Sequence, residues 1–131
     1  MTALDRAAIV GRARDLVGVR FRAQGRERST GLDCIGVVAE AMGIDGPPAH
    51  YSLRGGTPIE LERGLTAAGL RRTGREAEAG DVLVMRPAAE QLHLAIWTGG
   101  GIVHADARLG RVVERPGTPL WPVIDIWRME Q

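Results

Sequence analysis

The spacing of hydrophobic residues changes once along this chain, from a helical period to an alternating one, and this change constrains the fold most. In the first half, apolar residues recur every three or four positions, most clearly over residues 3–17, and Gly18 can end that helix. After Gly80-Asp81, apolar residues alternate or run continuously in short segments, which is typical of strands. These segments are residues 82–85, 92–97, 102–105, 112–114 and 123–127. The order predicts one α+β domain over residues 1–131, with N-terminal helices packed on a C-terminal antiparallel β-sheet.

Two further helices are predicted before the strands. One begins within a residue or two of Cys34, because Asp33 is a capping-type residue, and it ends near Gly43. The other covers about residues 57–69, where a threonine cap precedes a proline at the first helical position. Residues 19–26 are interpreted as a loop that must pass close to Cys34, because only a short polar link joins the two.

The composition excludes several classes of protein. The 131 residues suffice for one hydrophobic core, and the net charge of +1 indicates neither nucleic acid nor a membrane as a partner. One cysteine excludes an internal disulfide and no zinc-ligand pattern occurs, so we expect no metal and no cofactor. The first residues are charged and contain no apolar core of signal-peptide length, so we expect synthesis in the cytoplasm without a signal peptide.

Cys34 is the strongest candidate for a reactive group. A thiol at a helix N-terminus faces unpaired N–H groups and the positive end of the helix dipole, and both stabilise the nucleophilic thiolate. Gly36 would keep the first helical turn uncrowded, so that another segment can approach it closely. The alternative is a buried free cysteine that packs like a small apolar residue. This stretch of sequence leaves both interpretations open.

Two of the three histidines, His93 and His104, lie in the half of the chain that is predicted to form strands. A tight turn at the glycines of residues 99–101 would form a hairpin and bring them close, so that one ring could orient the other. A cysteine, a histidine and a second polar group from distant segments fit a papain-like arrangement. Alternatively, each histidine is a hydrogen-bonded structural residue, or both bind a metal with Asp106, although that grouping is loose.

Five segments of the chain, taken in order, resemble the NlpC/P60 cysteine peptidases. The family motifs are G-x-P-Y, D-C-S-G-L-V, P-G-D-L, H-V-G-I-Y and I-H-A. The matching residues are 18–25, 31–38, 79–83, 93–97 and 102–105. The gaps between the matches are also family-like, and together they cover nearly the whole chain.

The resemblance implies a papain-like NlpC/P60 fold and a single catalytic domain. It implies hydrolysis of peptidoglycan stem peptides, typically between D-glutamate and the diamino acid, through a thioester acyl-enzyme. By carry-over of the motifs, Cys34 is the nucleophile, His93 the general base and His104 the residue that orients His93. The backbone N–H of Cys34 would help to hold the oxyanion.

The resemblance also concerns residues around the cysteine. Phe21 replaces the tyrosine of the family, Ile35 replaces a serine, and Gln24 could supply a side-chain N–H to the substrate. Asp33 could bind a substrate amine or cap the helix. The segment Gln24-Gly25-Arg26 resembles phage-type members that are encoded among the tail genes of prophages and gene transfer agents. This resemblance implies that phage-like tail proteins are partners of the chain and that the chain is incorporated into a tail particle.

Other interpretations remain open. The departures at Phe21 and Ile35 favour a catalytically weak or inactive tail-tip structural protein, and a papain-like amidase acting on another bond would retain the same thiol chemistry. Arg22, Arg26 and Arg28 flank the cysteine segment and could meet substrate carboxylates, although solvated arginines are common in loops.

Overall fold

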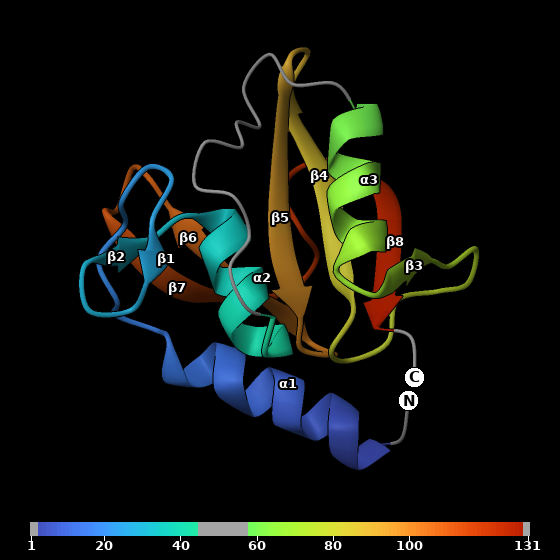
Figure 1. Cartoon of the computed structure of the whole chain (residues 1–131), viewed down its shortest axis with the longest axis horizontal. Coiled ribbons are helices and arrows are strands. Elements are labelled where there is room, and N and C mark those ends of the chain that lie inside the picture. The colour runs from blue at the N-terminus through green and yellow to red at the C-terminus, as the bar shows by residue number, and fades with distance from the viewer. Residues whose placement is uncertain (1–2, 45–57, 130–131) are drawn as a thin grey trace.

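The computed structural model describes residues 3–44 and 58–129. Within these residues, three helices come first along the chain and are followed by a sheet of six strands (Figure 1). The helices are α1 (Ala3–Asp15), α2 (Cys34–Met42) and α3 (Pro58–Ala67). The strands are β1 (Arg26–Glu27), β2 (Gly31–Leu32), β3 (Leu70–Arg72), β4 (Val82–Ala88), β5 (Gln91–Trp97), β6 (Gly101–Asp106), β7 (Arg111–Pro116) and β8 (Val123–Met129).

The strands form one large antiparallel sheet and one small strand pair. The large sheet has the order β3-β8-β4-β5-β6-β7, and each pair of neighbours is antiparallel. β1 and β2 pair separately beside the start of α2. The five strand segments that the sequence predicts correspond to β4 through β8, and the predicted α+β class with an antiparallel sheet is confirmed.

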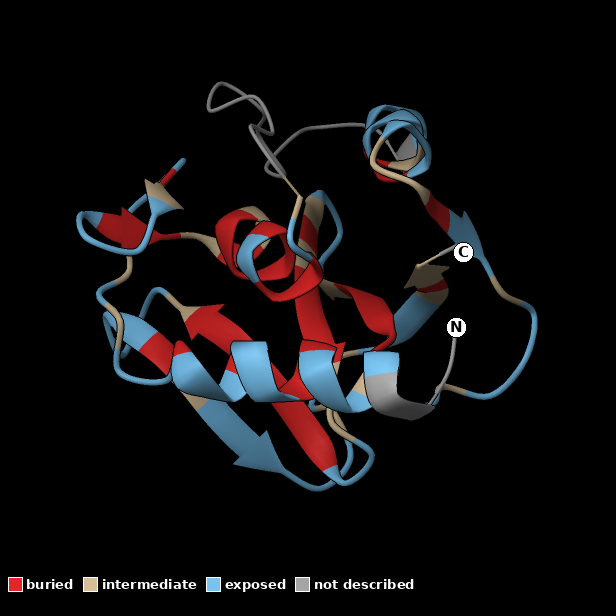
Figure 2. Cartoon of the chain, turned by 60° about the horizontal axis from the view of Figure 1, so that its bottom comes forward, coloured by how far each residue is buried: buried red, intermediate tan, exposed pale blue. Residues whose placement is uncertain are grey.

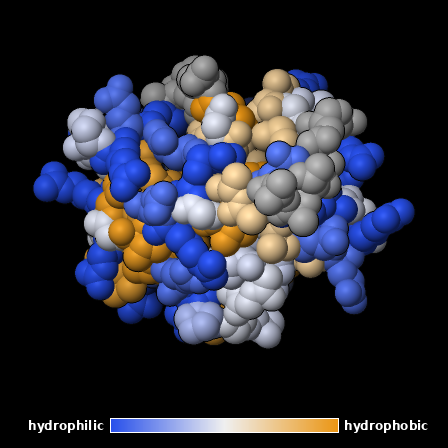
Figure 3. All heavy atoms as spheres, turned by 90° about the horizontal axis from the view of Figure 1, so that it is seen from below, coloured by the Kyte–Doolittle hydropathy of each residue, from blue (hydrophilic) through white to orange (hydrophobic). Residues whose placement is uncertain are grey.

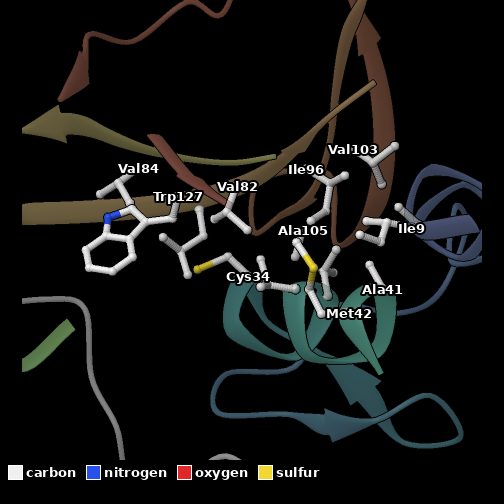
Figure 4. Packing of buried hydrophobic residues seen from close by; sticks show 14 of the residues in the cluster. Ile9, Cys34, Ala41, Met42, Val82, Val84, Ile96, Val103, Ala105 and Trp127 are labelled. Carbon is white, nitrogen blue, oxygen red and sulfur yellow. The ribbon is translucent and has the colours of Figure 1, made fainter. Parts of the chain in front are cut away.

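All three helices contribute to a core on one face of the sheet. Figure 2 shows α2 as an almost wholly buried helix, whereas α1 exposes most of its outer side. Figure 4 shows Cys34, Ala41 and Met42 of α2 facing the strands, with Ile9 of α1 beside them. The sheet side chains of this cluster include Val82, Val84, Leu92, Leu94, Ile96, Val103 and Ala105.

A second, smaller cluster lies on the opposite face of the sheet. Its buried members are Leu83, Met85, Ala95 and Ile102, and the partly buried Trp97 and Trp121 pack against them. Because side chains alternate between the faces of a strand, His93 belongs to the face of Ala95 and Trp97.

Some elements differ from those predicted. Residues 19–26 are not a simple loop, because Arg20 forms a β-bridge with Arg111 and Phe21 forms one with Leu32. The short strands β1, β2 and β3 were not predicted, because two or three residues are too few to show a period. The threonine cap at Thr57 and the third histidine lie outside the described residues.

The outer surface of α1 is largely polar. Figure 3 shows this side from below as mostly hydrophilic atoms with a hydrophobic area towards its left. The exposed residues of α1 include Asp5, Arg12, Arg14 and Asp15. None of the helices in the described part of the chain is long and apolar enough to cross a membrane.

Candidate active site

The N-terminus of α2 is built as the sequence predicts. Asp33 is the N-cap, with extended backbone (φ −97°), and its Oδ1 accepts the N–H of Gly36 at 2.9 Å. Cys34 follows as the first helical residue, and its side chain is buried, with 7% exposed. The helix ends at Gly43, whose φ of 70° is the left-handed conformation that glycine tolerates.

A neighbouring segment passes directly over this first helical turn. The carbonyl of Gly25 accepts the N–H of Asp33 at 3.2 Å. A Cβ atom added to Gly36 would lie 2.4 Å from that same carbonyl oxygen. The close approach that the sequence predicts at Gly36 is therefore confirmed, and it depends on the absence of a side chain there.

β5 and β6 are paired over only part of their length. Within the described residues their register aligns Ile96 with Val103 and Trp97 with Ile102. Continued by one residue, the same register would set Ala95 opposite His104, which makes His93 a diagonal neighbour of His104 on one face. The ladder between β5 and β6 thus ends just before the two histidines, where the sheet meets the start of α2.

The thiol of Cys34 lies at the end of this ladder. Trp97 donates its N–H to the carbonyl of Asp81 on the β4 side of β5, at 2.9 Å. Because successive N–H groups of a strand point to opposite sides, Leu94 directs its N–H towards β6. A backbone hydrogen bond from Leu94 acts on the Cys34 thiol. Cys34 is therefore held against the residue that follows His93.

The two strand histidines form a hydrogen-bonded pair. Nε2 of His93 lies 2.8 Å from Nδ1 of His104, and the rings meet edge to face at a centroid distance of 5.0 Å. His104 is 2% exposed, whereas His93 is partly buried. The hairpin thus brings together the two histidines that the sequence singles out, with the ring of His104 fixed in the sheet.

Trp121 covers this pair from the loop that precedes β8. Its ring contacts His93 and His104 edge to face, with centroid distances of 5.4 and 5.9 Å. The sequence indicates Trp121 only as a residue of the core or of a cleft wall, because nothing in the segment Pro119-Leu120-Trp121-Pro122 relates it to a histidine nearly thirty positions earlier. Only the order of the strands brings β8 next to β4 and the loop of Trp121 next to the site.

Burial dominates the electrostatics of the site. It raises the pKa of the Cys34 thiol to about 12, and the neighbouring carboxylate of Asp33 adds to the shift. It lowers the pKa of His93 to about 4, and the charge of a protonated His104 would add to that shift. Burial also lowers the pKa of His104, while the carboxylate of Asp106 opposes the change. The free site therefore holds a neutral thiol and neutral imidazoles near pH 7.

This result corrects the expectation that the helix N-terminus would favour the thiolate of Cys34. The N–H groups of the helix start and the charge of Arg26 do act in that direction. However, the thiol is almost fully removed from water and lies next to the capping carboxylate of Asp33, and these two effects are larger. A thiolate forms readily here only when a positive charge forms beside it.

The remaining residues that the sequence singles out around the cysteine differ in exposure and in their contacts. Asp33 accepts a hydrogen bond from Nη1 of Arg26 at 2.7 Å in addition to capping α2, so its carboxylate is already engaged. Gln24 is exposed and has a left-handed backbone with φ of 58°. Phe21 and Ile35 are partly buried against the main core.

No group of three or more metal-ligating side chains occurs in residues 3–44 and 58–129. Asp106, which the sequence suggested as a third ligand, instead accepts the backbone N–H groups of Arg108 and Leu109 at 2.8 and 2.9 Å. This is the geometry of a side chain that stabilises a turn. The described residues thus offer a cysteine and two histidines for acid–base and nucleophilic chemistry.

Comparison with solved structures identifies similar folds. The chain matches the NlpC/p60 domain of the peptidoglycan hydrolase SagA with 25% identity and a TM-score of 0.59, over 85% of this chain and 88% of that one. It matches the P60 domain of an antigen from M. avium subspecies paratuberculosis with 19% identity and a TM-score of 0.64, over 96% and 95% of the two chains.

A third match is the peptidoglycan hydrolase RipB from Mycobacterium tuberculosis, with 19% identity and a TM-score of 0.61. It covers 98% of this chain and 66% of that one. No family model matches the sequence, and no curated protein matches it either. The likeness is therefore one of three-dimensional structure, at low sequence identity.

Proposed function

We propose that this chain, which has the NlpC/P60 fold, is a cysteine peptidase that hydrolyses peptidoglycan stem peptides at the bond between D-glutamate and the diamino acid. The observation that carries the proposal is the hydrogen-bonded pair of His93 on β5 and His104 on β6, with Cys34 at the start of α2 held against Leu94, the residue that follows His93. The names of two structural neighbours, both peptidoglycan hydrolases, support the choice of substrate.

The hydrogen bond between the histidines suggests how the base is oriented. If Nε2–H of His93 donates to Nδ1 of His104, Nδ1 of His93 is left unprotonated and can accept a proton. His104 then acts on the orientation and charge of His93 and does not touch the substrate. This is the role of the third member of a nucleophilic triad.

Acylation begins when His93 removes the proton of the Cys34 thiol as sulfur attacks the carbonyl carbon. The two charges form together, so the imidazolium compensates for the burial that disfavours a lone thiolate. The tetrahedral oxyanion is held by the backbone N–H of Cys34, which as a helix N-terminal donor has no partner within the helix. The C–N bond then breaks, His93 returns the proton to the leaving amine, and a thioester on Cys34 remains.

Deacylation uses the same groups in reverse roles. His93, neutral again, removes a proton from water as the oxygen attacks the thioester carbonyl. The C–S bond breaks, the proton passes to the sulfur of Cys34, and the peptide leaves as a carboxylic acid. One water is consumed and one peptide bond is lost, so no cofactor enters the balance.

The proposal is tested by incubating purified peptidoglycan with the wild-type chain and with Cys34→Ala and His93→Ala, followed by mass spectrometry of the soluble fragments. We expect the wild type to release fragments with a new D-glutamate carboxylate, and both variants to lose at least a thousandfold in rate. Circular dichroism must show that the variants remain folded. Full activity of Cys34→Ala would exclude the proposal.

The same experiment separates the alternatives. Fragments cut at a different amide would indicate the papain-like amidase. A folded wild type that releases no fragments from any peptidoglycan substrate would indicate an inactive tail-tip structural protein.

We also propose that this enzyme reaches the wall as part of a phage-like tail particle, on the resemblance of Gln24-Gly25-Arg26 to phage-type members. Immunodetection of the chain in purified tail particles after induction of the producing cell tests this proposal. Recovery of the chain only outside the particles would contradict it without affecting the proposed activity.

A further inference from the structure

The face of the sheet that carries the histidine pair continues outward to exposed arginines. In the antiparallel pairing of β6 with β7, His104 is opposite Val113 and Asp106 is opposite Arg111. Directly opposite residues of neighbouring strands lie on the same face. Arg111 therefore extends from the same side of the sheet as His104, one pair farther along the hairpin.

The segment before β1 continues this face beyond the edge of β7. Arg20 forms an antiparallel bridge with Arg111, and the N–H of Phe21 donates to the carbonyl of Gly110 at 2.9 Å. Phe21 packs against the main core, so Arg20 and Arg22 on either side of it point away from that core. Arg20, Arg22 and Arg111, which we call the arginine strip, are all exposed.

The charge of the arginine strip is not balanced by acidic side chains. Within residues 3–44 and 58–129, no arginine of the strip forms an ion pair with a carboxylate. The arginines that do form ion pairs are Arg6, Arg14, Arg26, Arg72 and Arg128. The nearest carboxylate in the ladder, Asp106, is engaged with two backbone N–H groups of its turn. Like charges on directly paired residues such as Arg20 and Arg111 are destabilising, so this arrangement does not serve the stability of the fold.

The backbone of the arginine strip is hydrogen-bonded or paired with residues that lie two positions from Cys34 and from His104. Leu32 donates its N–H to the carbonyl of Arg20 at 2.9 Å and accepts the N–H of Arg22 at 3.2 Å. Leu32 precedes Cys34 by two residues, and Arg111 is paired with the residue two positions after His104. A substrate peptide that extends a few residues from the reacting carbonyl would thus reach the strip, since one extended residue spans roughly 3.5 Å.

We propose that Arg20, Arg22 and Arg111 form a carboxylate-binding subsite that selects acidic peptides. The proposal rests on the proposed function, because the acidic peptide is then the stem peptide with its free D-glutamate and C-terminal carboxylates. Guanidinium groups suit this ligand, since each presents paired N–H donors in the geometry of a carboxylate. The subsite gives the enzyme a preference for peptides whose carboxylates are not amidated.

The test uses two soluble stem tetrapeptides, one with free carboxylates and one with D-isoglutamine and a C-terminal amide. Binding to Cys34→Ala is measured by calorimetry, and hydrolysis by the active chain is measured as kcat/KM. The test variant replaces Arg20, Arg22 and Arg111 by Gln. The control replaces Arg63, Arg71 and Arg75 by Gln, which removes the same charge from exposed positions on α3, β3 and the following turn.

We expect the unmodified strip to bind the acidic peptide at least tenfold more tightly than the amidated one, a ratio that one charge-assisted hydrogen bond supplies. The ratio should fall to about one in the strip variant. It should persist in the control, and kcat/KM for both peptides should be unchanged in the control. A ratio near one before any substitution, or a ratio that survives loss of the strip, would overturn the proposal. Because binding is measured without catalysis, failure of the active chain to hydrolyse either peptide would count against the proposed function alone.

Discussion

Cys34 combines a helix N-terminus with nearly complete burial, and burial determines its charge in the free site. Its pKa of about 12 predicts that alkylation by iodoacetamide accelerates about tenfold per pH unit between pH 7 and 10, without the plateau that an ordinary thiol shows above pH ~8.5. The rate is measured by mass spectrometry of the modified chain at each pH. Asp33→Asn keeps an oxygen that can cap α2 but removes the carboxylate charge, so it should speed the reaction at every pH. A plateau below pH 8.5 would contradict this assignment.

Trp121 sets the environment of the histidine pair. Because its ring lies edge-on to both imidazoles, Trp121→Ala should admit water and move the pKa of His93 from about 4 towards 6.5. The titration is followed by NMR of the histidine ring protons. Trp97→Ala is the matched control, because Trp97 packs in the same cluster and the ring contacts of the histidines are with Trp121. An unchanged His93 titration in Trp121→Ala would show that the strands alone desolvate the ring.

The residues that define the site differ in how far the sequence indicates them. Cys34, His93 and His104 could be selected because their chemistry is rare in the chain and their order matches a family motif. The geometry of the histidine pair also follows from the hairpin. The raised pKa of Cys34 could not be predicted, because it depends on how deeply α2 is packed into the sheet.

At the scale of elements, the start of α2 depends on one glycine. Gly36→Ala would place a Cβ 2.4 Å from the carbonyl oxygen of Gly25, and neither backbone can move without breaking the bond between Gly25 and Asp33. We expect a loss of roughly 1–3 kcal/mol in the free energy of unfolding, which urea denaturation measures.

Gly64→Ala is the control for the Gly36 substitution. Gly64 lies within α3, and a Cβ there meets nothing within 4 Å. Alanine is the better helix former, so this change should stabilise the chain by up to about 1 kcal/mol. Equal effects of the two substitutions would show that helix propensity, and not the contact with Gly25, decides the outcome at Gly36.

The elements were predictable to different degrees for physical reasons. The bounds of α2 follow from its cap and its terminal glycine, and the strands from their alternation. In contrast, the bridges of Arg20 and Phe21 join segments of mixed polarity with no period of their own. Their position is set by β7 and β2, so only the assembled sheet reveals the arginine strip.

At the scale of the whole molecule, Asp81 joins three elements that are distant in sequence. It is 0% exposed and accepts hydrogen bonds from Nε and Nη2 of Arg128 in β8, at 2.9 and 2.8 Å. It also accepts the backbone N–H of Glu78 at 2.8 Å and is 3.3 Å from Nη1 of Arg6 in α1. The sequence indicates only a turn at this position, because the partners come from both ends of the chain.

We therefore expect Asp81→Asn to weaken the assembly of α1 and β8 onto β4 together. The amide has the shape of the carboxylate, but it leaves the guanidinium groups of Arg6 and Arg128, 16% and 11% exposed, without their buried counter-charge. Removing one partner of a buried ion pair costs about 3–5 kcal/mol, and urea denaturation should show a loss of this order. Glu78→Gln is the control: its carboxylate pairs with the same two arginines but is 59% exposed, so we expect a change of about 0.5 kcal/mol or less. If the two variants unfold at the same urea concentration, the buried charge of Asp81 does not hold the termini to the sheet.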